Sequence, residues 1–301
     1  MAVAPPPLNI SQTDLGIGDI LCSLYALEGL SIANGRPPMV LHMADHRDWL
    51  QAVAIPNLDV VPLRPENAGL IDIHLGDSEA QYRQKLRENH DPKCWYGLKL
   101  GGVEPQRPAI NPALATAAIP FRKPFVVLAP FATRTNRTWE IHNWRLLADQ
   151  LKAAGYQVIA LDAPNQPGRC AGPGCDYWFG QRPLWTMQVC QQAALVISND
   201  SALSHLGGLL GVKTLVLLSQ QNPERYFSLT DNAFIRPQHA CVGCRFQPEL
   251  GYEPRCDFGC WALQSISPRT VAETALQLLE NARQPAATRF QRSPAAPINL
   301  T

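Results

Sequence analysis

Residues that could do chemistry gather where short apolar segments give way to helices. The run 195–198 is apolar and contains β-branched residues, and Asn199, Asp200 and Ser201, which favour turns and helix caps, follow it directly. The pattern predicts that a buried strand ends here and a helix begins. Asp200 and Ser201 then lie at the carboxyl end of a strand, where open α/β sheets bind ligands. The free N–H groups of the helix suit an anion such as a pyrophosphate.

The helix after Ser201 is expected to bury one face. Its leucines share that face: Leu203, Leu206, Leu209 and Leu210. Ser204 and His205 fall on the opposite face, which we expect to look outward. Gly211 should end the helix, and residues 212–219 form a second buried strand that returns parallel to the first.

A second candidate is the turn Gly16-Ile17-Gly18-Asp19 near the start of the chain. It follows a short strand, so the Asp19 carboxylate is expected to project into a cleft between domains, where it could take a proton from an acceptor hydroxyl. The alternative is that Asp19 is only the N-cap of the next helix. Asp14 and His42 are the other candidates for a base.

The third candidate is a cysteine segment, residues 241–260, with the spacing Cys241-x-x-Cys244 and Cys256-x-x-x-Cys260. Two close pairs can each supply two thiolate ligands, so the segment predicts a structural zinc or iron site. Free thiols and disulfides are the alternatives. Cys22 and Cys190 lack such spacing and are interpreted as core residues.

Composition limits the class of protein. The 301 residues carry a net charge of +1, and only 17% are charged, so no basic surface predicts nucleic-acid binding and a zinc-ribbon nucleic-acid binder is disfavoured. The N-terminal residues lack a signal-peptide pattern, and no apolar run is long enough to cross a membrane. We therefore expect a cytoplasmic protein without a transmembrane segment.

Alternating strand and helix patterns predict α/β architecture with parallel sheets. Strands are expected at 8–11, 39–43, 58–61, 70–74, 125–129, 157–161, 195–198 and 212–219. Helices are expected at about 19–34, 44–53, 79–89, 139–154, 184–193 and 268–283, and residues 163–183 are expected to form a loop. A proline-rich linker divides the chain into domains 1–118 and 119–283. Residues 284–301 are expected to be disordered.

Two motifs together resemble glycosyltransferase family 9, the ADP-heptose glycosyltransferases. One is Asp200-Ser-x-x-x-His205 with its small-residue helix, the following strand and Asn222-Pro223, and the other is the Gly16 to Asp19 loop with its helix. The resemblance covers roughly residues 8 to 282. It implies a GT-B fold, in which two Rossmann-like domains face each other across a cleft.

The family resemblance also implies roles for single residues. Asp19 aligns with the proposed general base of an inverting transfer that needs no metal. Residues 132–139 resemble the phosphate-binding loop, in which Arg137 replaces the usual lysine and Thr133 and Arg134 are further donor contacts; a solvated loop is the alternative. Asp200 would contact sugar hydroxyls, the Ser201 N–H the phosphate, and His205 the phosphate or sugar.

Two loops depart from the family pattern. Residues 162–167 lack the usual Gly-rich loop with a glutamate for the ribose, and residues 218–223 replace the usual Phe-Gly-Pro-Thr-Asp-Pro run.

The expected function is transfer of a sugar to a lipopolysaccharide-type or protein acceptor. The first candidate is heptose from ADP-heptose, and peripheral contact with the inner membrane is expected as well. The alternatives are a different nucleotide-sugar donor and a non-catalytic nucleotide-sugar-binding protein of the same fold.

Overall fold

The structure is a computed structural model of the 301-residue chain. It describes residues 6–13, 15–33, 38–88, 91–162, 176–179, 182–218, 220, 229–237, 239, 243–244, 256 and 259–283. The chain divides into two compact units: residues 1–113 with 224–229, and residues 114–223 with 230–301. We call them the N-terminal unit and the C-terminal unit.

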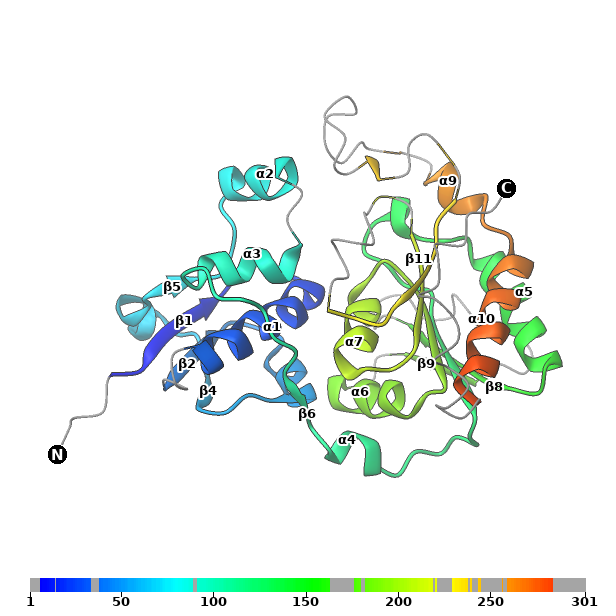
Figure 1. The fold of residues 1–301 in the computed structure, drawn as a ribbon, viewed down its shortest axis with the longest axis horizontal. Helices are drawn as coiled ribbons and strands as arrows, with labels where there is room; N and C mark the ends of the chain where they lie inside the picture. The colour runs from blue at the N-terminus through cyan, green and yellow to red at the C-terminus, as the bar shows by residue number, and fades with distance from the viewer. Residues whose placement is uncertain are drawn as a thin grey trace. The chain divides into compact units, whose positions relative to one another are not determined.

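The N-terminal unit contains a four-stranded parallel sheet in the order β4-β2-β1-β5 (Figure 1). Its strands are β1 (Leu8–Gln12), β2 (Met39–Met43), β4 (Leu58–Pro62) and β5 (Ile73–His74). The order places β1 and β5 side by side although residues 13–72 separate them in the chain. The direction of strand addition reverses between these two strands, and loops that leave the carboxyl ends of strands at such a point form ligand sites in α/β sheets.

Helices and short turns complete this unit. They are α1 (Ile17–Ala33), η1 (Arg47–Ala52), η2 (Pro65–Leu70), α2 (Glu79–Arg87) and α3 (Pro92–Lys99), with a small antiparallel pair of β3 (Val53–Ala54) and β6 (Ala109–Ile110). Helix α1 packs against α3. Most of α1 is buried, which explains why its sequence is apolar on nearly every face.

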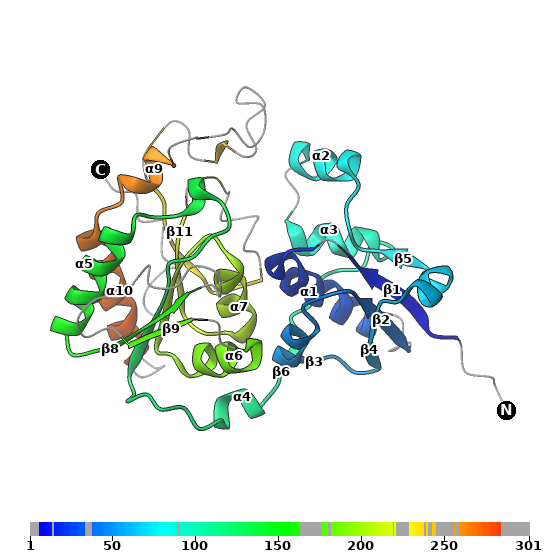
Figure 2. The same ribbon diagram turned by 180° about the vertical axis from the view of Figure 1, so that it is seen from behind.

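The C-terminal unit contains a six-stranded parallel sheet in the order β12-β11-β10-β7-β8-β9 (Figure 2). Its strands are β7 (Phe125–Ala129), β8 (Gln157–Asp162), β9 (Asp176–Phe179), β10 (Leu195–Asn199), β11 (Thr214–Leu217) and β12 (Ala233–Ile235). Strands β7 and β10 are completely buried, as expected for central strands covered on both faces. The strand order reverses between them.

Helices cover both faces of this sheet (Figures 1 and 2). They are α5 (Ile141–Ala153) and α10 (Pro268–Arg283) on one face and α6 (Pro183–Gln192) and α7 (Ala202–Leu210) on the other. Leu147 and Leu151 of α5 share a core with Val126 of β7 and with Val271 and Ala275 of α10. Shorter helical elements are α4 (Ala113–Thr116), η3 (Thr135–Arg137) and α9 (Trp261–Gln264).

Most of the expected elements are present, but several differ, and helix α3 was not among the expected elements. Helix α1 begins at Ile17 rather than at Asp19, and residues 44–53 hold a short 3₁₀ turn, η1, in place of a helix. Residues 176–179, expected to be loop, form β9 because they pair with β8 at the sheet edge. The expected linker contains β6 and α4. Gly211 ends α7 with φ 71°, as predicted, because glycine adopts this left-handed conformation without strain.

Candidate functional site

Asp19 lies in the first turn of α1, directly after the loop that leaves β1. It is the third residue of the helix, and the carbonyl oxygen of Gly16 accepts the first helical hydrogen bond, from the Ile20 N–H at 3.0 Å. Asp19 is therefore not the N-cap of α1, and the alternative that it serves only as that cap is wrong. Gly16 is exposed and Gly18 is half-buried, the second residue of α1.

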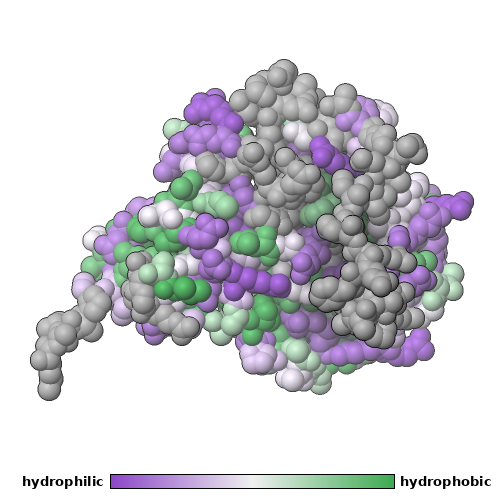
Figure 3. Space-filling model, in the orientation of Figure 1, coloured by the Kyte–Doolittle hydropathy of each residue, from purple (hydrophilic) through white to green (hydrophobic). Residues whose placement is uncertain are grey.

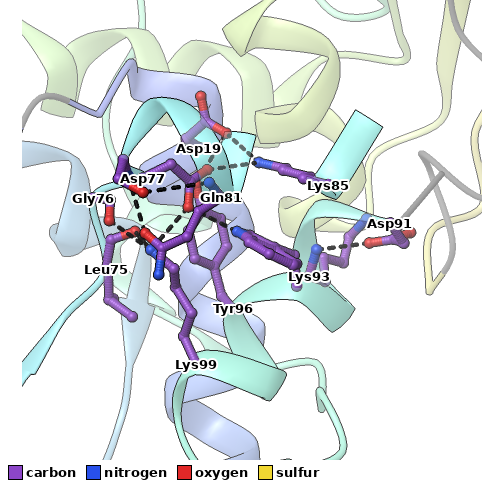
Figure 4. Close-up of polar contacts among 12 residues, drawn as sticks. Asp19, Leu75, Gly76, Asp77, Gln81, Lys85, Asp91, Lys93, Tyr96 and Lys99 are labelled. Atoms are coloured by element: carbon purple, nitrogen blue, oxygen red, sulfur yellow. Dashed lines mark hydrogen bonds and ion pairs between the residues drawn. The ribbon is translucent and has the colours of Figure 1, made fainter. Parts of the chain in front are cut away.

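Two donors from other helices contact the same oxygen of Asp19 (Figure 4). The Tyr96 hydroxyl of α3 donates to Oδ1 at 3.0 Å, and Nζ of Lys85 on α2 lies 3.5 Å from that atom. The Asp19 side chain keeps 42% of its surface exposed, whereas Lys85 is buried. The carboxylate is thus held from the protein side and reaches solvent on the other.

A second carboxylate, Asp77, belongs to the same network. It follows β5, and its Oδ1 accepts hydrogen bonds from the Trp95 indole and lies 2.8 Å from Nζ of Lys99, while Oδ2 lies 3.7 Å from Nζ of Lys85. Asp19 and Asp77 both lie beside Lys85, because their loops leave the neighbouring strands β1 and β5. Asp77, Lys85 and Tyr96 could not be predicted as site residues, because nothing in the local sequence indicates that β5 lies beside β1.

Close packing between these two loops depends on Gly76. A Cβ atom at this position would stand 2.8 Å from the carbonyl oxygen of Thr13, closer than such atoms approach in proteins. Lys99 donates to the carbonyl oxygens of Leu75 and Gly76 at 3.0 and 2.5 Å. The absence of a side chain at residue 76 therefore allows the loops to carry Asp19 and Asp77 to one place.

The C-terminal unit holds the remaining candidates at the carboxyl ends of β7 and β10. Asp200 follows β10 and is 4% exposed, yet neither of its carboxylate oxygens accepts a hydrogen bond from any described residue. An Arg137 guanidinium nitrogen lies 3.8 Å from Oδ2, and Nε of Arg137 donates to the Gln220 side chain at 3.2 Å. A buried carboxylate without hydrogen bonds is costly, so both oxygens of Asp200 have the capacity to accept hydrogen bonds from hydroxyl donors.

The loop that carries Arg137 is held by residues that the sequence analysis did not single out. The Asn199 side chain donates to the Pro130 carbonyl at 2.7 Å and accepts from the Trp139 N–H at 3.2 Å. The Gln264 side chain donates to the Thr138 carbonyl and accepts from the Glu140 N–H, both at 2.9 Å. Asn199 was interpreted only as a turn residue; it ends β10 and joins the loop after β7 to the loop after β10.

Thr133 and Arg134 have exposed side chains in the same loop, while Arg137 is half-buried. Ser201 is the N-cap of α7, and its N–H donates to the Ser204 hydroxyl at 3.2 Å. His205 is 7% exposed, so it does not look outward as expected. The outer side of α7 is covered because Thr230 approaches Gly208 and the Asn232 side chain donates to the Ser204 carbonyl.

The cysteine segment is only partly described. Cys241 lies outside the described residues, and Cys244 and Cys260 are buried while Cys256 is half-buried. The Cys260 sulfur accepts a hydrogen bond from the Leu263 N–H and caps α9. Within the part of the chain that the structure describes, no three His, Cys, Asp or Glu side chains form a metal-binding group. The predicted structural zinc or iron site stays a prediction.

Cys22 and Cys190 are core residues, as expected, and are 1% and 0% exposed. Burial raises the pKa of each thiol to about 12. Neither cysteine is a nucleophile at neutral pH, because only the thiolate is reactive.

The fold is shared with proteins of known structure. Three solved structures share the fold: TibC, an iron-containing dodecameric glycosyltransferase from enterotoxigenic E. coli H10407, E. coli ADP-heptose lps heptosyltransferase II, and E. coli heptosyltransferase WaaC with ADP. TibC has a TM-score of 0.72 at 17% identity, over 94% of this chain and 78% of that one. Heptosyltransferase II has a TM-score of 0.63 at 14% identity, over 92% of this chain and 100% of that one. WaaC has a TM-score of 0.57 at 14% identity, over 91% of this chain and 98% of that one. The chain therefore has the fold of the GT-B glycosyltransferases.

Part of the sequence matches a known family. Residues 84–171 match the model of glycosyltransferase family 9 (heptosyltransferase). This match confirms the resemblance inferred from the motifs; it includes Thr133, Arg134 and Arg137, whereas Asp19 and Asp200 lie outside it. No protein of curated function shows significant sequence similarity to the chain.

Proposed function

We propose that the protein is an inverting glycosyltransferase that transfers heptose from ADP-heptose to an acceptor hydroxyl. The observation that carries this proposal is the buried, unsatisfied carboxylate of Asp200 beside Arg137, at the point where the strand order of the C-terminal unit reverses. A sugar nucleotide supplies hydroxyl donors for the carboxylate and a diphosphate for the guanidinium. TibC has also been solved in complex with ADP-D-beta-D-heptose, and WaaC with ADP, which supports the choice of donor.

The residues would divide the reaction between the two units. Asp19 takes the proton from the acceptor hydroxyl, whose oxygen forms the new bond to the anomeric carbon while the bond from that carbon to the diphosphate breaks. Arg137 stabilises the negative charge of the departing ADP, with Thr133, Arg134 and the α7 N-terminus at Ser201 as further donors. His205 is proposed to lie near the phosphate or sugar. Every proton and electron pair is then accounted for by acceptor, Asp19 and ADP.

The donor is tested by calorimetry with ADP-heptose, ADP-glucose, GDP-mannose and UDP-glucose on the parent and on Asp200→Asn. We expect ADP-heptose to bind most tightly to the parent and at least about tenfold more weakly to Asp200→Asn, because the loss of a charged hydrogen-bond acceptor costs about 1.5–3 kcal/mol. ADP alone should bind the two proteins alike, since it lacks the sugar. Preference for another nucleotide sugar would support the alternative donor. The cause would then be sought in residues 162–167 and 218–223, which depart from the family pattern.

The acceptor, which we propose to be a lipopolysaccharide-type glycan or a protein, binds in the N-terminal unit. None of the described helices is long and apolar enough to span a membrane. On the face seen in Figure 3, hydrophilic and hydrophobic residues are interspersed over the described part of the chain.

We propose a cytoplasmic enzyme with peripheral membrane contact, tested by fractionation of cells and by cosedimentation with vesicles of bacterial lipids. A non-catalytic sugar-nucleotide-binding protein would bind the donor but release no ADP with any acceptor.

We further propose a structural zinc or iron ion at Cys241, Cys244, Cys256 and Cys260, with no part in the chemistry. Elemental analysis of the purified protein should find about one equivalent of metal, and Cys244→Ser should lose it. Metal-free protein of parental stability would favour free thiols.

A further inference from the structure

Lys85 is a buried cation that is shared between two carboxylates. Its Nζ lies 3.5 Å from Oδ1 of Asp19 and 3.7 Å from Oδ2 of Asp77, and its side chain is only 9% exposed (Figure 4). It also stands over the Tyr96 ring, 5.1 Å from the ring centre. Contacts with Asp19, Asp77 and the Tyr96 ring restrict the Lys85 ammonium group on three sides, so its side chain is held beside Asp19.

Tyr96 fixes the same carboxylate by a neutral hydrogen bond. Burial, followed by the negative charge of Asp19, raises the pKa of the Tyr96 hydroxyl well above its ordinary value. The phenol is therefore protonated near neutral pH and donates to Asp19 Oδ1. Tyr96 orients the carboxylate without adding charge, whereas Lys85 adds charge at the same oxygen.

We propose that Lys85 is a positioning residue for Asp19, which holds it ionised and ready to accept a proton; this inference rests on the proposed role of Asp19 as base. A cation beside a carboxylate favours the ionised form, so Asp19 would remain a base at lower pH than it otherwise would. Lys85 itself would not touch acceptor or donor.

Asp77 explains why the proton transfer is tolerated. When Asp19 takes a proton it loses its charge, and a buried ammonium left without a counter-ion would be strongly unfavourable. Lys85 keeps Asp77 as its partner in that state. Asp77 is in turn held by the Trp95 indole and by Lys99, so it does not move away from Lys85. The network therefore accommodates Asp19 in both protonation states.

Other ionisable groups near Asp19 come from each element around it. Cys22 of α1 is influenced by Asp19 but remains a thiol, with a pKa of about 12, and Tyr96 of α3 remains neutral. Lys93 of α3 forms its own ion pair with Asp91 at 3.6 Å. Lys85 forms a direct ion pair with Asp19, at 3.5 Å.

The test is a pH titration of the Asp19 carboxyl carbon by NMR in the full-length protein with ¹³C-labelled aspartate, the signal being assigned by its loss in Asp19→Asn. In Lys85→Met we expect the Asp19 signal to titrate at a pH about one unit higher than in the parent, since an adjacent cation shifts a carboxyl by one or more units. Lys85→Arg should titrate near the parent because the charge is kept. Lys93→Met, which removes a buried cation paired elsewhere, should shift the signal much less.

This measurement requires no donor or acceptor, so it separates the inference from the proposed function. Melting curves establish that each variant is folded, and Lys85→Gln replaces Lys85→Met if the latter is not. An unmoved Asp19 signal in a folded Lys85→Met or Lys85→Gln protein would overturn the inference. In a second readout, ADP release from ADP-heptose by Lys85→Met should fall at low pH with KM for the donor unchanged. Parental ADP release by Asp19→Asn would instead overturn the role of Asp19 as base.

Discussion

A guanidinium nitrogen of Arg137 lies 3.8 Å from Oδ2 of Asp200, and both side chains are largely buried, 15% and 5% exposed. The two residues are separated by residues 138–199 in the chain and come from the loops that follow β7 and β10. Removal of Arg137 would leave a buried carboxylate with no ion pair or hydrogen bond to any residue that the structure describes. We expect Arg137→Ala to lower the free energy of unfolding by about 1–3 kcal/mol.

The coupling between these residues is measured by a double-mutant cycle in urea. The double variant Arg137→Ala with Asp200→Asn should be more stable than the sum of the single changes predicts, because the stranded charge is gone. In the same proteins, the thermal shift produced by ADP should be lost with Arg137→Ala and kept with Asp200→Asn. Strict additivity, or an unchanged ADP shift in Arg137→Ala, would contradict the assignment of this pair to the donor site.

Asp19→Asn is expected to lower kcat by roughly 10²-fold or more, in line with the loss of a general base, with little change in ADP affinity. The asparagine oxygen can still accept the Tyr96 hydrogen bond, and Lys85 keeps Asp77, so the melting temperature should change little. Release of ADP from ADP-heptose is the measurement. Near-parental turnover would return the search for a base to Asp14, which lies outside the described residues, or to His42, which is 3% exposed.

Gln264→Ala should weaken donor binding although the residue is proposed to contact no ligand. Its side chain holds both sides of Trp139 through the Thr138 carbonyl and the Glu140 N–H, and the loss of two hydrogen bonds costs about 1–3 kcal/mol. The loop that carries Arg137 should then become less ordered, and calorimetry should give a higher Kd for ADP. Gln150→Ala is the matched control, since Gln150 donates to one carbonyl, that of Leu146 on its own helix. Equal Kd values in the two variants would leave Gln264 without a role in the site.

Gly76→Ala should destabilise the N-terminal unit, because a Cβ there meets the Thr13 carbonyl oxygen at 2.8 Å. Overpacking of this kind costs about 1–3 kcal/mol. Gly69→Ala is the control: a Cβ at Gly69 would have nothing within 4 Å, so its effect should stay within about 0.5 kcal/mol. Urea unfolding measures both. A tolerated Gly76→Ala would mean that the loops after β1 and β5 can separate without cost.

Alkaline pH should destabilise the fold in part through Cys22 and Cys190. Burial raises the pKa of both thiols from 9.0 to about 12, so the unfolded chain releases their protons first. The stability that this shift contributes is present below pH 9 and falls as pH rises toward 12, by up to about 1.4 kcal/mol per pH unit and thiol. Unfolding free energies at pH 8 and 10 should therefore differ less in Cys22→Ala with Cys190→Ala than in the parent. Exposed Cys94 serves as a graded control: burial also raises the pKa of its thiol, but Cys94→Ala should reduce the pH dependence less than the loss of the two buried thiols.

Local pattern was sufficient for much of this protein. Apolar runs of strand length predicted the central strands β7 and β10, because a parallel strand covered on both faces must be apolar throughout. The glycine at 211 predicted the end of α7, and two short motifs predicted a resemblance to glycosyltransferase family 9, whose model matches residues 84–171. In each case a few consecutive residues carry the signal, because the backbone conformation and the burial of that short segment restrict which residue types it can contain.

Strand order was decided only by the tertiary structure. Residues 13–72 separate β1 from β5, and no local pattern indicates that the two strands pair, so the sequence could not predict that Asp77 and Lys85 would join Asp19. The same reason hid Gln264, whose hydrogen bonds join residues more than 120 positions apart. The burial of His205 was also missed, because the chain at Thr230 and Asn232 returns over α7 from far along the sequence. Side chains near a site can be inferred from spacing when one strand and one helix position them, but a network from several elements depends on which strands the hydrophobic core brings together.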